Sequence, residues 1–309
     1  MRGSLHSLIG ACLALNCRKE LTFRPLIWLG VLAAFASPHQ NAMAAESVPL
    51  KVMTYNLRYA SKLPPNAWFQ RRPVAAAMLR ELKPDVIGTQ EGLYQQVKDL
   101  QTDLPDYAWI GTGRDGGSRG EFMAVFYRLD RLEPLEFDHF WLSDTPDKIG
   151  STTWGNTNRR MVTWVRFLDR KSNEEFYFFN THFDHEKQPA REKSAVLIRE
   201  RVDALKTKLP VILVGDFNAS AEANPAYDTL VGAEGFSDTW KTAIEPGEAI
   251  GTFHNYAGPR KGGARIDWIL TRGPVGALST SVVTYSKDGQ YPSDHFPVMA
   301  TLEWQARKQ

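Results

Sequence analysis

Six short segments of this chain combine β-type apolar sequence with a polar side chain of the kind that does chemistry. An apolar run that borders directly on Asn, Asp, Glu or His predicts a strand whose end carries a reactive or metal-binding group. Because the segments lie far apart in the sequence, a fold that uses all six must gather several strand ends at one place. They contain Asn56, Glu91, His182, Asp216, Asp267 and the pair Asp294 and His295.

The sequence between these segments predicts both helices and strands. Residues 189–206 place apolar side chains on one helical stripe opposite charged ones, which predicts an amphipathic helix. Residues 211–214 are uniformly apolar, which is typical of a central strand covered on both faces. Strands in mixed order with helices packed outside them indicate an α+β sandwich. The remaining predicted helices are 73–82 and 93–100, and the remaining strands are 51–57, 85–88, 122–127, 135–142, 161–167, 176–180, 266–270, 282–285 and 298–302.

The first 44 residues have the layout of a secretory signal peptide. Basic residues precede an apolar run at 26–36 that is short for a membrane span, and small residues follow at 42–44. We therefore predict a signal peptide over 1–44, one domain over 45–309, and a periplasmic or secreted protein. A signal anchor that is never cleaved is the alternative.

Composition narrows the chemistry of the remaining domain. Both cysteines, Cys12 and Cys17, lie in the leader, which excludes a thiol nucleophile, a disulfide and a Cys-ligated zinc site from 45–309. Removing the leader's four basic residues and one acidic residue from the chain's 37 and 35 leaves 33 basic and 34 acidic residues. Nucleic-acid-binding proteins usually carry a basic excess, so this balance does not favour a long polyanion as partner. We expect a monomer with no membrane span after leader removal.

The polar residues at the strand ends fit a phosphoester hydrolase that uses Mg²⁺ or Mn²⁺. Such a site needs a carboxylate for the ion, a base for water and donors for the phosphate oxygens. Glu91 is the predicted metal ligand, with Asp294 on the metal side. Asn56 either ligates the metal or holds Glu91. Taken alone, Asn56 could also be a turn residue, and Glu91 could simply begin a helix.

The catalytic groups are predicted from the same strand ends. Asp216 is the expected base, and Asn218, two residues further on, can donate to the phosphate. His182 and His295 are placed to stabilise negative charge. Asp267 lies in an apolar strand, where a buried carboxylate needs a partner, and it can orient His295.

Three further residues are predicted to contact substrate. They are Arg58, Arg160, whose alternative role is a surface strand charge, and His254, whose alternative is a loop residue. Substrate specificity is expected to reside in loops, and Trp68 and Trp154 in them either stack on substrate or cover the core. These loops are 61–70, 111–120, which we expect to be flexible because of its five glycines, 146–158 and 244–261.

The motifs resemble those of the endonuclease/exonuclease/phosphatase superfamily, which is deoxyribonuclease I-like, and in particular its secreted bacterial members. The resemblance covers about residues 50–302 and is carried by YNLRY at 55–59, THFDH at 181–185 and YPSDHFP at 291–297. It implies a four-layer αββα sandwich with the metal site at one edge of the sheets, and in-line attack of water without a covalent intermediate. It also implies the roles given above for the strand-end residues.

One position departs from part of that superfamily. Abasic-site endonucleases carry an acid where this chain has Arg58, and an arginine cannot ligate a metal. The departure suggests a contact to a negative substrate group in place of a second metal. With the near-neutral charge it favours a small or lipid-derived phosphoester as substrate. A secreted nuclease of the same fold is the alternative, followed by a non-catalytic envelope binding protein.

Overall fold

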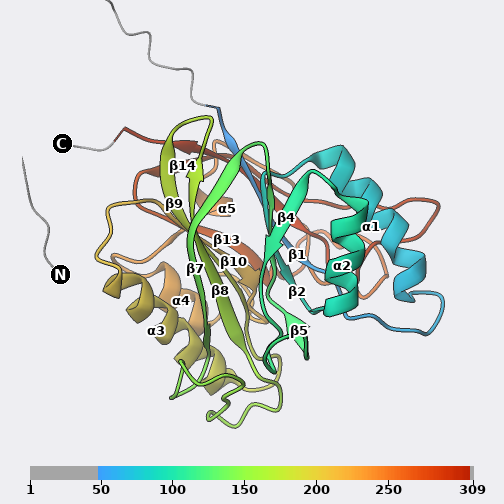
Figure 1. Ribbon diagram of the computed structural model, residues 1–309, viewed down its shortest axis with the longest axis horizontal. Helices are drawn as coiled ribbons and strands as arrows, with labels where there is room; N and C mark the ends of the chain where they lie inside the picture. The colour runs from blue at the N-terminus through green and yellow to red at the C-terminus, as the bar shows by residue number, and fades with distance from the viewer. Residues whose placement is uncertain (1–47, 307–309) are drawn as a thin grey trace, which may run out of the picture. The chain divides into compact units, whose positions relative to one another are not determined.

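Two β-sheets packed face to face organise residues 48–306, which are the residues that this computed structural model describes (Figure 1). The larger sheet has the order β12 (Glu245–Pro246), β14 (Val275–Val282), β15 (Val298–Trp304), β1 (Leu50–Asn56), β2 (Val86–Gln90), β6 (Val125–Arg128) and β4 (Tyr107–Ile110). The smaller sheet has the order β11 (Ser237–Asp238), β13 (Asp267–Arg272), β10 (Val211–Asp216), β9 (Glu174–His182), β8 (Met161–Asp169) and β7 (Leu132–Trp141). A short ribbon pairs β3 (Gly92–Leu93) with β5 (Glu121–Phe122).

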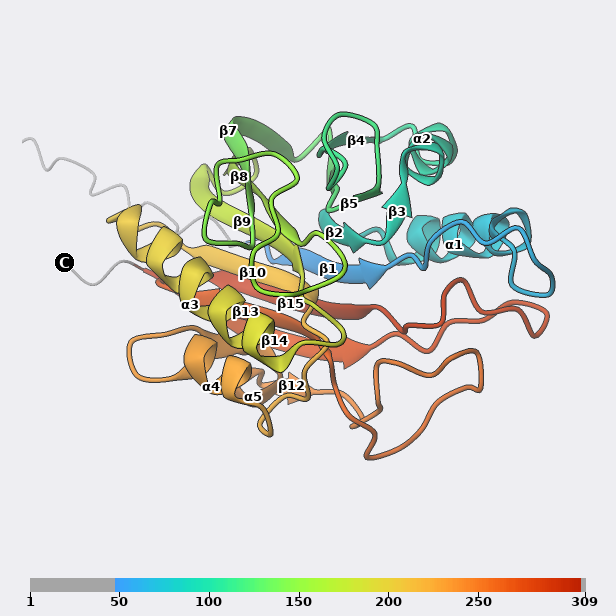
Figure 2. The ribbon, with the colours of Figure 1, turned by 90° about the horizontal axis from the view of Figure 1, so that it is seen from below.

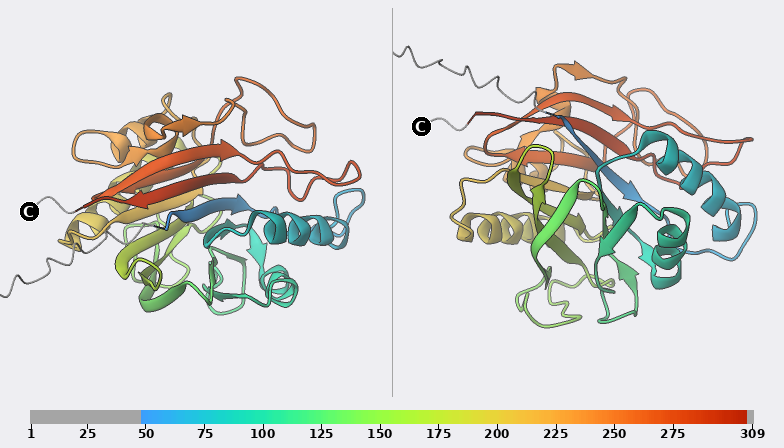
Figure 3. Two further views of the ribbon diagram at one scale, coloured as in Figure 1. Left: turned by 90° about the horizontal axis from the view of Figure 1, so that it is seen from above. Right: turned by 45° about the horizontal axis from the view of Figure 1, so that its top comes forward.

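Helices cover the outer face of each sheet. α1 (Trp68–Leu82) and α2 (Tyr94–Asp103) pack on the larger sheet, where their apolar side chains join those of β1, β2 and β6. α3 (Gln188–Ala204) and α4 (Pro225–Val231) pack in the same way on the smaller sheet, and the one-turn helix α5 (Thr239–Thr242) follows β11. Figures 2 and 3 show the sheets between the two helical layers. The predicted four-layer αββα sandwich is confirmed.

A polar seam crosses the apolar space between the sheets just below the ends of β2 and β9. Gln90 on β2 donates to Asn180 on β9 at 2.8 Å, and the Asn180 amide donates to the carbonyl oxygens of Thr89 and Ala124 at 2.9 and 3.0 Å. Every member is buried, so these bonds offset the cost of removing the amides from water. The seam fixes how the two sheets meet directly beneath the strand ends.

The structure confirms the helices and most strands expected from the sequence and corrects several bounds. α1 begins at Trp68 and not at residue 73, because Trp68 and Arg71 are already buried in its first turns. The expected strand at 282–285 is wrong: β14 ends at Val282, where its pairing with Val298 of β15 ends. The small residues of β14 gave no strand pattern. The expected strand at 122–127 is divided between β5 and β6.

The expected signal peptide at 1–44 lies outside the described residues. Within residues 48–306 no helix has the length and apolar character needed to cross a bilayer.

Candidate active site

The expected strand ends meet at one edge of the sheets because parallel neighbours end at the same edge and an antiparallel neighbour begins there. β1 and β2 are parallel; β1 ends at Asn56, and β2 ends one residue before Glu91. β9 and β10 are also parallel and place His182 opposite Asp216. β13 is antiparallel to β10, so it begins at this edge, with Asp267 opposite Asp216.

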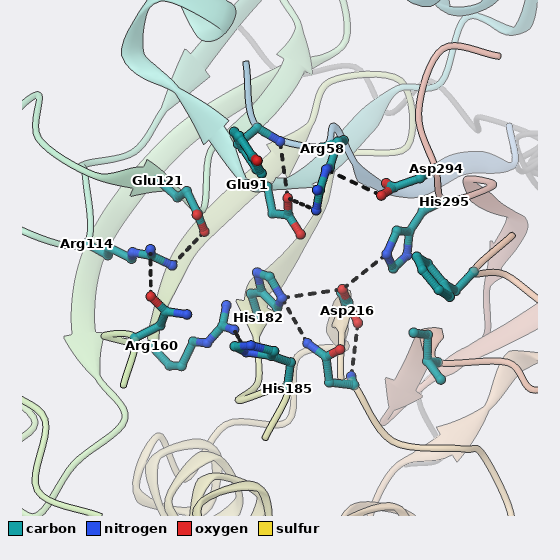
Figure 4. A pocket seen from close by; sticks show the side chains of 15 residues that line it. Arg58, Glu91, Arg114, Glu121, Arg160, His182, His185, Asp216, Asp294 and His295 are labelled. Atoms are coloured by element: carbon teal, nitrogen blue, oxygen red, sulfur yellow. Dashed lines mark hydrogen bonds and ion pairs between the residues drawn. The ribbon is translucent and has the colours of Figure 1, made fainter. Parts of the chain in front are cut away.

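A cavity of about 370 Å³ opens at this edge (Figure 4). Asn56 and Asp267 lie below its surface and contact residues that line it. His254 is not part of the lining. Eight of the predicted site residues do line it: Arg58, Glu91, Arg160, His182, Asp216, Asn218, Asp294 and His295.

Asp216 is held by hydrogen bonds to both carboxylate oxygens. Oδ1 accepts the backbone N–H of Asn218 at 2.9 Å, and Oδ2 accepts the side-chain amide of Asn56 at 2.9 Å. Burial, followed by the negative charge of Asp267, raises the pKa of Asp216 to about 7. A fixed carboxylate with a pKa near neutrality has the properties of a general base.

His295 forms an acid–imidazole pair with Asp267. Its Nδ1 lies 3.0 Å from Asp267 Oδ2, and its Nε2 lies 3.8 Å from Asp216 Oδ2. Burial disfavours the charged imidazole, but the carboxylates of Asp267 and Asp216 outweigh it and raise the pKa of His295 to about 10. His295 is therefore a buried positive charge beside the carboxylate of Asp216.

His182 and Asn218 face each other across the centre of the cavity floor. Asn218 Nδ2 lies 3.0 Å from His182 Nε2 and also donates to the carbonyl oxygen of Phe183 at 3.1 Å. His182 Nε2 is 3.4 Å from Asp216 Oδ2. Burial, and then the charge of Arg160, lower the pKa of His182 well below its ordinary value, so the ring is neutral. The pair offers uncharged hydrogen-bonding groups to a ligand.

Asn56 connects the base to the acidic side of the cavity. Its Nδ2 donates to Glu91 Oε1 at 3.0 Å as well as to Asp216. Its Oδ1 accepts the backbone N–H of Arg58 at 2.9 Å, which fixes the orientation of the amide. Of the two roles predicted for Asn56, these contacts favour holding Glu91 over ligating a metal with its oxygen.

Arg58 lies between two of the carboxylates predicted to face the metal. Its Nη1 is 3.8 Å from Glu91 Oε2, and its Nε is 3.4 Å from Asp294 Oδ2 (Figure 4). Burial raises the pKa of Asp294. The guanidinium thus partly neutralises this side of the cavity and is half-exposed to a ligand.

The donor set at the cavity fits a hard divalent cation. Glu91, His182 and Asp216 each offer one ligand atom, and these atoms lie within 4.8 Å of one another. Mg²⁺ binds oxygen ligands, usually one or two carboxylates with several waters. The carboxylates of Glu91 and Asp216 provide this. A second group, which contains Asp216, Asp267 and His295, is a poorer candidate because His295 carries a proton there.

Three non-glycine residues at this edge have left-handed backbone conformations. Their φ angles are 53° at Arg58, 59° at Glu91 and 47° at Asn218. Such conformations cost of the order of 1–3 kcal/mol each, and they persist where the surrounding structure fixes them. Their clustering at the cavity indicates that these side chains are positioned at a cost to stability.

Arg160 occupies the wall beside His182. It is buried, its Nη2 lies 3.1 Å from His185 Nδ1, and its Nε has no hydrogen-bond partner among the described residues. The nearest carboxylate, Asp184, is 4.0 Å away. Because Arg160 also lines the cavity, its guanidinium is a candidate contact for an anion there.

Three aromatic side chains named from the sequence lie away from the cavity. His254 stacks on Phe296 with ring centroids 3.7 Å apart. Trp68 is buried in α1 and donates to Asp99 at 2.7 Å, and Trp154 packs beside α3. The structure thus places all three in packing positions, which was the alternative role of the two tryptophans, while His254 lies in a loop, as its own alternative stated.

Residues 53–295 match the sequence profile of the Endonuclease/Exonuclease/phosphatase family. The chain belongs to the endonuclease/exonuclease/phosphatase family. Members of the family are hydrolases of phosphoester bonds and generally depend on a divalent metal.

Two solved structures of this family resemble the chain closely. A family protein from Bacteroides thetaiotaomicron is 35% identical with a TM-score of 0.80, and the match covers 84% of this chain and 100% of that one. A mannosyl-6-phosphatase from Bacteroides thetaiotaomicron VPI-5482 is 36% identical with a TM-score of 0.78, over 82% and 100% of the two chains.

An uncharacterized protein of Acanthamoeba polyphaga mimivirus is 31% identical over 172 residues, which are 53% of this chain and 63% of that protein. The match therefore spans less than two thirds of the viral protein.

Several lining residues of this family member were not singled out from the sequence. They include Arg114, Glu121 and Asn158. The glycine-rich segment 111–120 was expected to be flexible, but it is a closed turn in which Arg114 N–H donates to the Glu121 carbonyl at 2.9 Å. The sequence signal that could have identified two of them is a pair of opposite charges, Arg114 within the glycine-rich segment and Glu121 directly after it.

Arg71 supports the site from within the fold. It is fully buried and donates to five backbone carbonyls and to no carboxylate. Three of these carbonyls belong to residues 57–59, and another, at 3.0 Å, belongs to Pro292 in the segment before Asp294. Arg71 therefore holds together the two segments that carry Arg58 and Asp294.

Proposed function

We propose that this family member is a divalent-metal-dependent phosphoesterase that hydrolyses a phosphomonoester of a small hydroxylated molecule. The observation that carries the proposal is the convergence of a base, a buried imidazolium and a metal-binding carboxylate on one cavity: Asp216, His295 and Glu91. Water activation, charge stabilisation and ion binding are the functions that displacement at phosphorus requires.

Asp216 would accept the proton of the attacking water, since its carboxylate is fixed and basic near neutral pH. Asn218 and His182 would exchange their mutual hydrogen bond for hydrogen bonds to phosphoryl oxygens. His295, kept charged and oriented by Asp267, would balance the negative charge that develops on the phosphoryl group.

Glu91, with Asp294 on the same side of the cavity, would hold one Mg²⁺ or Mn²⁺ ion, which leaves Asp216 free to act as the base. The bound ion would supply Lewis-acid stabilisation of the phosphoryl oxygens. Arg58 and Arg160, which both line the cavity, would contact phosphate oxygens. The position of Arg58 between Glu91 and Asp294 supports one ion and not two.

Water is the proposed nucleophile. The residues that line the cavity include no serine, threonine or cysteine, and the proposal gives the carboxylates and imidazoles among them other roles. Attack by water in line with the leaving oxygen then needs the base on one side of phosphorus and charge stabilisation around it.

A sugar phosphate is the substrate class that the comparisons favour. The neighbour named as a mannosyl-6-phosphatase is 36% identical, which is high enough for the catalytic groups to be shared. The cavity of about 370 Å³ is of a size for small ligands. The leader pattern in residues 1–44 supports action in the periplasm or outside the cell.

The proposal is tested by hydrolysis assays of the purified protein with Mg²⁺, with Mn²⁺ and with EDTA. The substrates are mannose 6-phosphate, p-nitrophenyl phosphate, bis-p-nitrophenyl phosphate and sphingomyelin. We expect phosphate release from the monoesters that EDTA abolishes and either metal restores. Glu91→Ala should raise the metal concentration needed for half-maximal rate. Turnover that is equal in EDTA, or preference for the diesters, would contradict the proposal.

A further inference from the structure

The wall of the cavity opposite the catalytic groups is built from charged and polar side chains that the proposed chemistry does not use. Arg114 Nη1 donates to Glu121 Oε2 at 2.6 Å, and Arg114 Nη2 donates to Asn158 Oδ1 at 3.2 Å. All three residues line the cavity together with Asp216 and His295. Figure 4 shows Arg114 and Glu121 on the side of the cavity away from Asp216 and His295.

This wall is held by hydrogen bonds and by a tight turn of the backbone. The carbonyl oxygen of Arg114 accepts the indole N–H of the buried Trp141 at 2.7 Å. The glycine-rich turn is closed so tightly that a Cβ added at Gly113 would lie 1.9 Å from the carbonyl oxygen of Arg119. The three side chains are therefore held in place before a ligand binds, which lowers the entropy cost of binding.

The free hydrogen-bonding groups of the wall match hydroxyls. Glu121 uses Oε2 for Arg114, so its Oε1 can accept a hydroxyl proton. Asn158 uses its oxygen for Arg114, so its amide N–H groups can donate. A ligand that both donates and accepts at neighbouring positions, as a diol does, satisfies the two groups at once.

The charge of the wall argues against a second phosphate. The Arg114 guanidinium is paired at 2.6 Å with the Glu121 carboxylate, and the two side chains are only 14% and 16% exposed. An added anion would approach a carboxylate as closely as a guanidinium. A neutral polyol avoids this repulsion and still uses the fixed dipoles of the pair.

We propose that Arg114, Glu121 and Asn158 form a subsite that binds hydroxyl groups of the leaving group. The subsite rests on the phosphomonoesterase function proposed above and determines its substrate specificity. Glu121 and Asn158 make the direct contacts, and Arg114 positions them. A substrate without hydroxyls would leave Glu121 Oε1 without a hydrogen-bond donor, so such substrates are disfavoured.

The test compares two primary alkyl phosphates that differ in hydroxyls: mannose 6-phosphate and cyclohexylmethyl phosphate. Their reacting ends are alike, so the ratio of their kcat/KM values reports the contacts to the leaving group. The parent protein should prefer the sugar phosphate. Glu121→Gln and Asn158→Ala should each lower the ratio by about tenfold, which is what one lost hydrogen bond to a fixed group is worth.

The matched control is Glu175→Gln, since Glu175 also pairs with an arginine, Arg166, at 2.8 Å but lies outside the cavity. It should leave the ratio unchanged. Asn158→Ala keeps the test open if Glu121→Gln fails to fold. A ratio within twofold of the parent in the folded variants would overturn the subsite. So would equal use of both phosphates by the parent, which would leave the phosphoesterase function standing, whereas no turnover of either would overturn both.

Discussion

At the scale of single residues, burial decides what each titratable group can do. Asp216 and Asp267 are both buried at the ends of neighbouring strands, but Asp267 faces the imidazole of His295, and Asp216 faces the cavity. Burial, followed by the charge of Asp267, raises the pKa of Asp216 to about 7, and the charges of Asp267 and Asp216 together raise the pKa of His295. Two acids with different neighbours thus acquire different roles.

Replacing Asp216 by Asn should remove the base without changing the size of the side chain. We expect kcat to fall by about 10²–10⁴-fold, the usual contribution of general-base catalysis, with little change in KM. Steady-state kinetics on the preferred monoester measures this, and circular dichroism checks the fold. Asp228→Asn, an exposed acid on α4, is the matched control. A variant that turns over at the parent rate would rule out Asp216 as the base.

His254 packs against Phe296 and does not line the cavity. Burial, followed by the charge of His295, lowers the pKa of His254 to about 4. The unfolded chain, with a His pKa near 6.5, binds a proton between about pH 4 and 6.5 that the folded protein does not bind. This residue therefore contributes stability above about pH 6.5 that is lost as the pH falls toward 4.

His254→Phe should remove this pH dependence while preserving the stacking on Phe296. Between pH 7 and pH 5 the unfolding free energy of the parent protein should fall by about 1–2 kcal/mol more than that of the variant. Urea unfolding at the two pH values measures the difference. Equal pH dependence in both proteins would show that His254 is not buried in its neutral form.

At the scale of elements, the site depends on how closely β2 approaches the smaller sheet. A Cβ added at Gly88 on β2 would lie 2.4 Å from Val214 Cγ2 and 2.8 Å from Asn180 Oδ1. Glycine is thus required for the polar seam between Gln90 and Asn180, and this seam sets the spacing of the strand ends that carry Glu91 and His182.

Gly88→Ala should destabilise the protein by about 1–3 kcal/mol, because the extra methyl group overpacks the interface between the sheets. Chemical unfolding measures the loss. The control is Gly276→Ala on β14, where the added Cβ meets only the side chain of Gln305, which can move away. If Gly88→Ala were no more destabilising than Gly276→Ala, the sheets would not be in the close contact described here.

At the scale of the whole molecule, charge and cavity size favour a small substrate. Residues 45–309 carry 33 basic and 34 acidic residues, so the domain has no general attraction for a polyanion. Two of the three arginines that line the cavity are paired with acids, Arg58 with Glu91 and Asp294, and Arg114 with Glu121. The domain therefore lacks the electrostatic term that supplies most of the affinity for duplex DNA.

We expect no nicking of supercoiled plasmid by the purified protein with Mg²⁺ under conditions in which it hydrolyses its preferred monoester. Agarose gel electrophoresis is the readout, and a metal-dependent nuclease assayed in the same buffer is the positive control. Rapid, salt-sensitive nicking would favour the nuclease alternative over the phosphomonoesterase function.

The sequence alone was enough to predict the layered sandwich and the polar strand ends. Apolar runs and the polar residues that border them are local patterns, so they can be recognised in the sequence without the tertiary structure. The two longest helices were predicted for the same reason, although α1 begins earlier than its pattern suggested. Local pattern failed for β14, whose small residues form a strand through pairing with β15 and β12.

Tertiary structure decided which polar groups share a cavity and what charge each one carries. From the sequence, His254 and Arg160 were both candidate contacts to substrate. In the fold, His254 stacks on Phe296, whereas Arg160 lines the cavity. Arg114 and Glu121 became neighbours of the site only through a closed turn. Contacts between distant segments and removal from water set these properties, and neither is encoded by the residues adjacent to a position in the sequence.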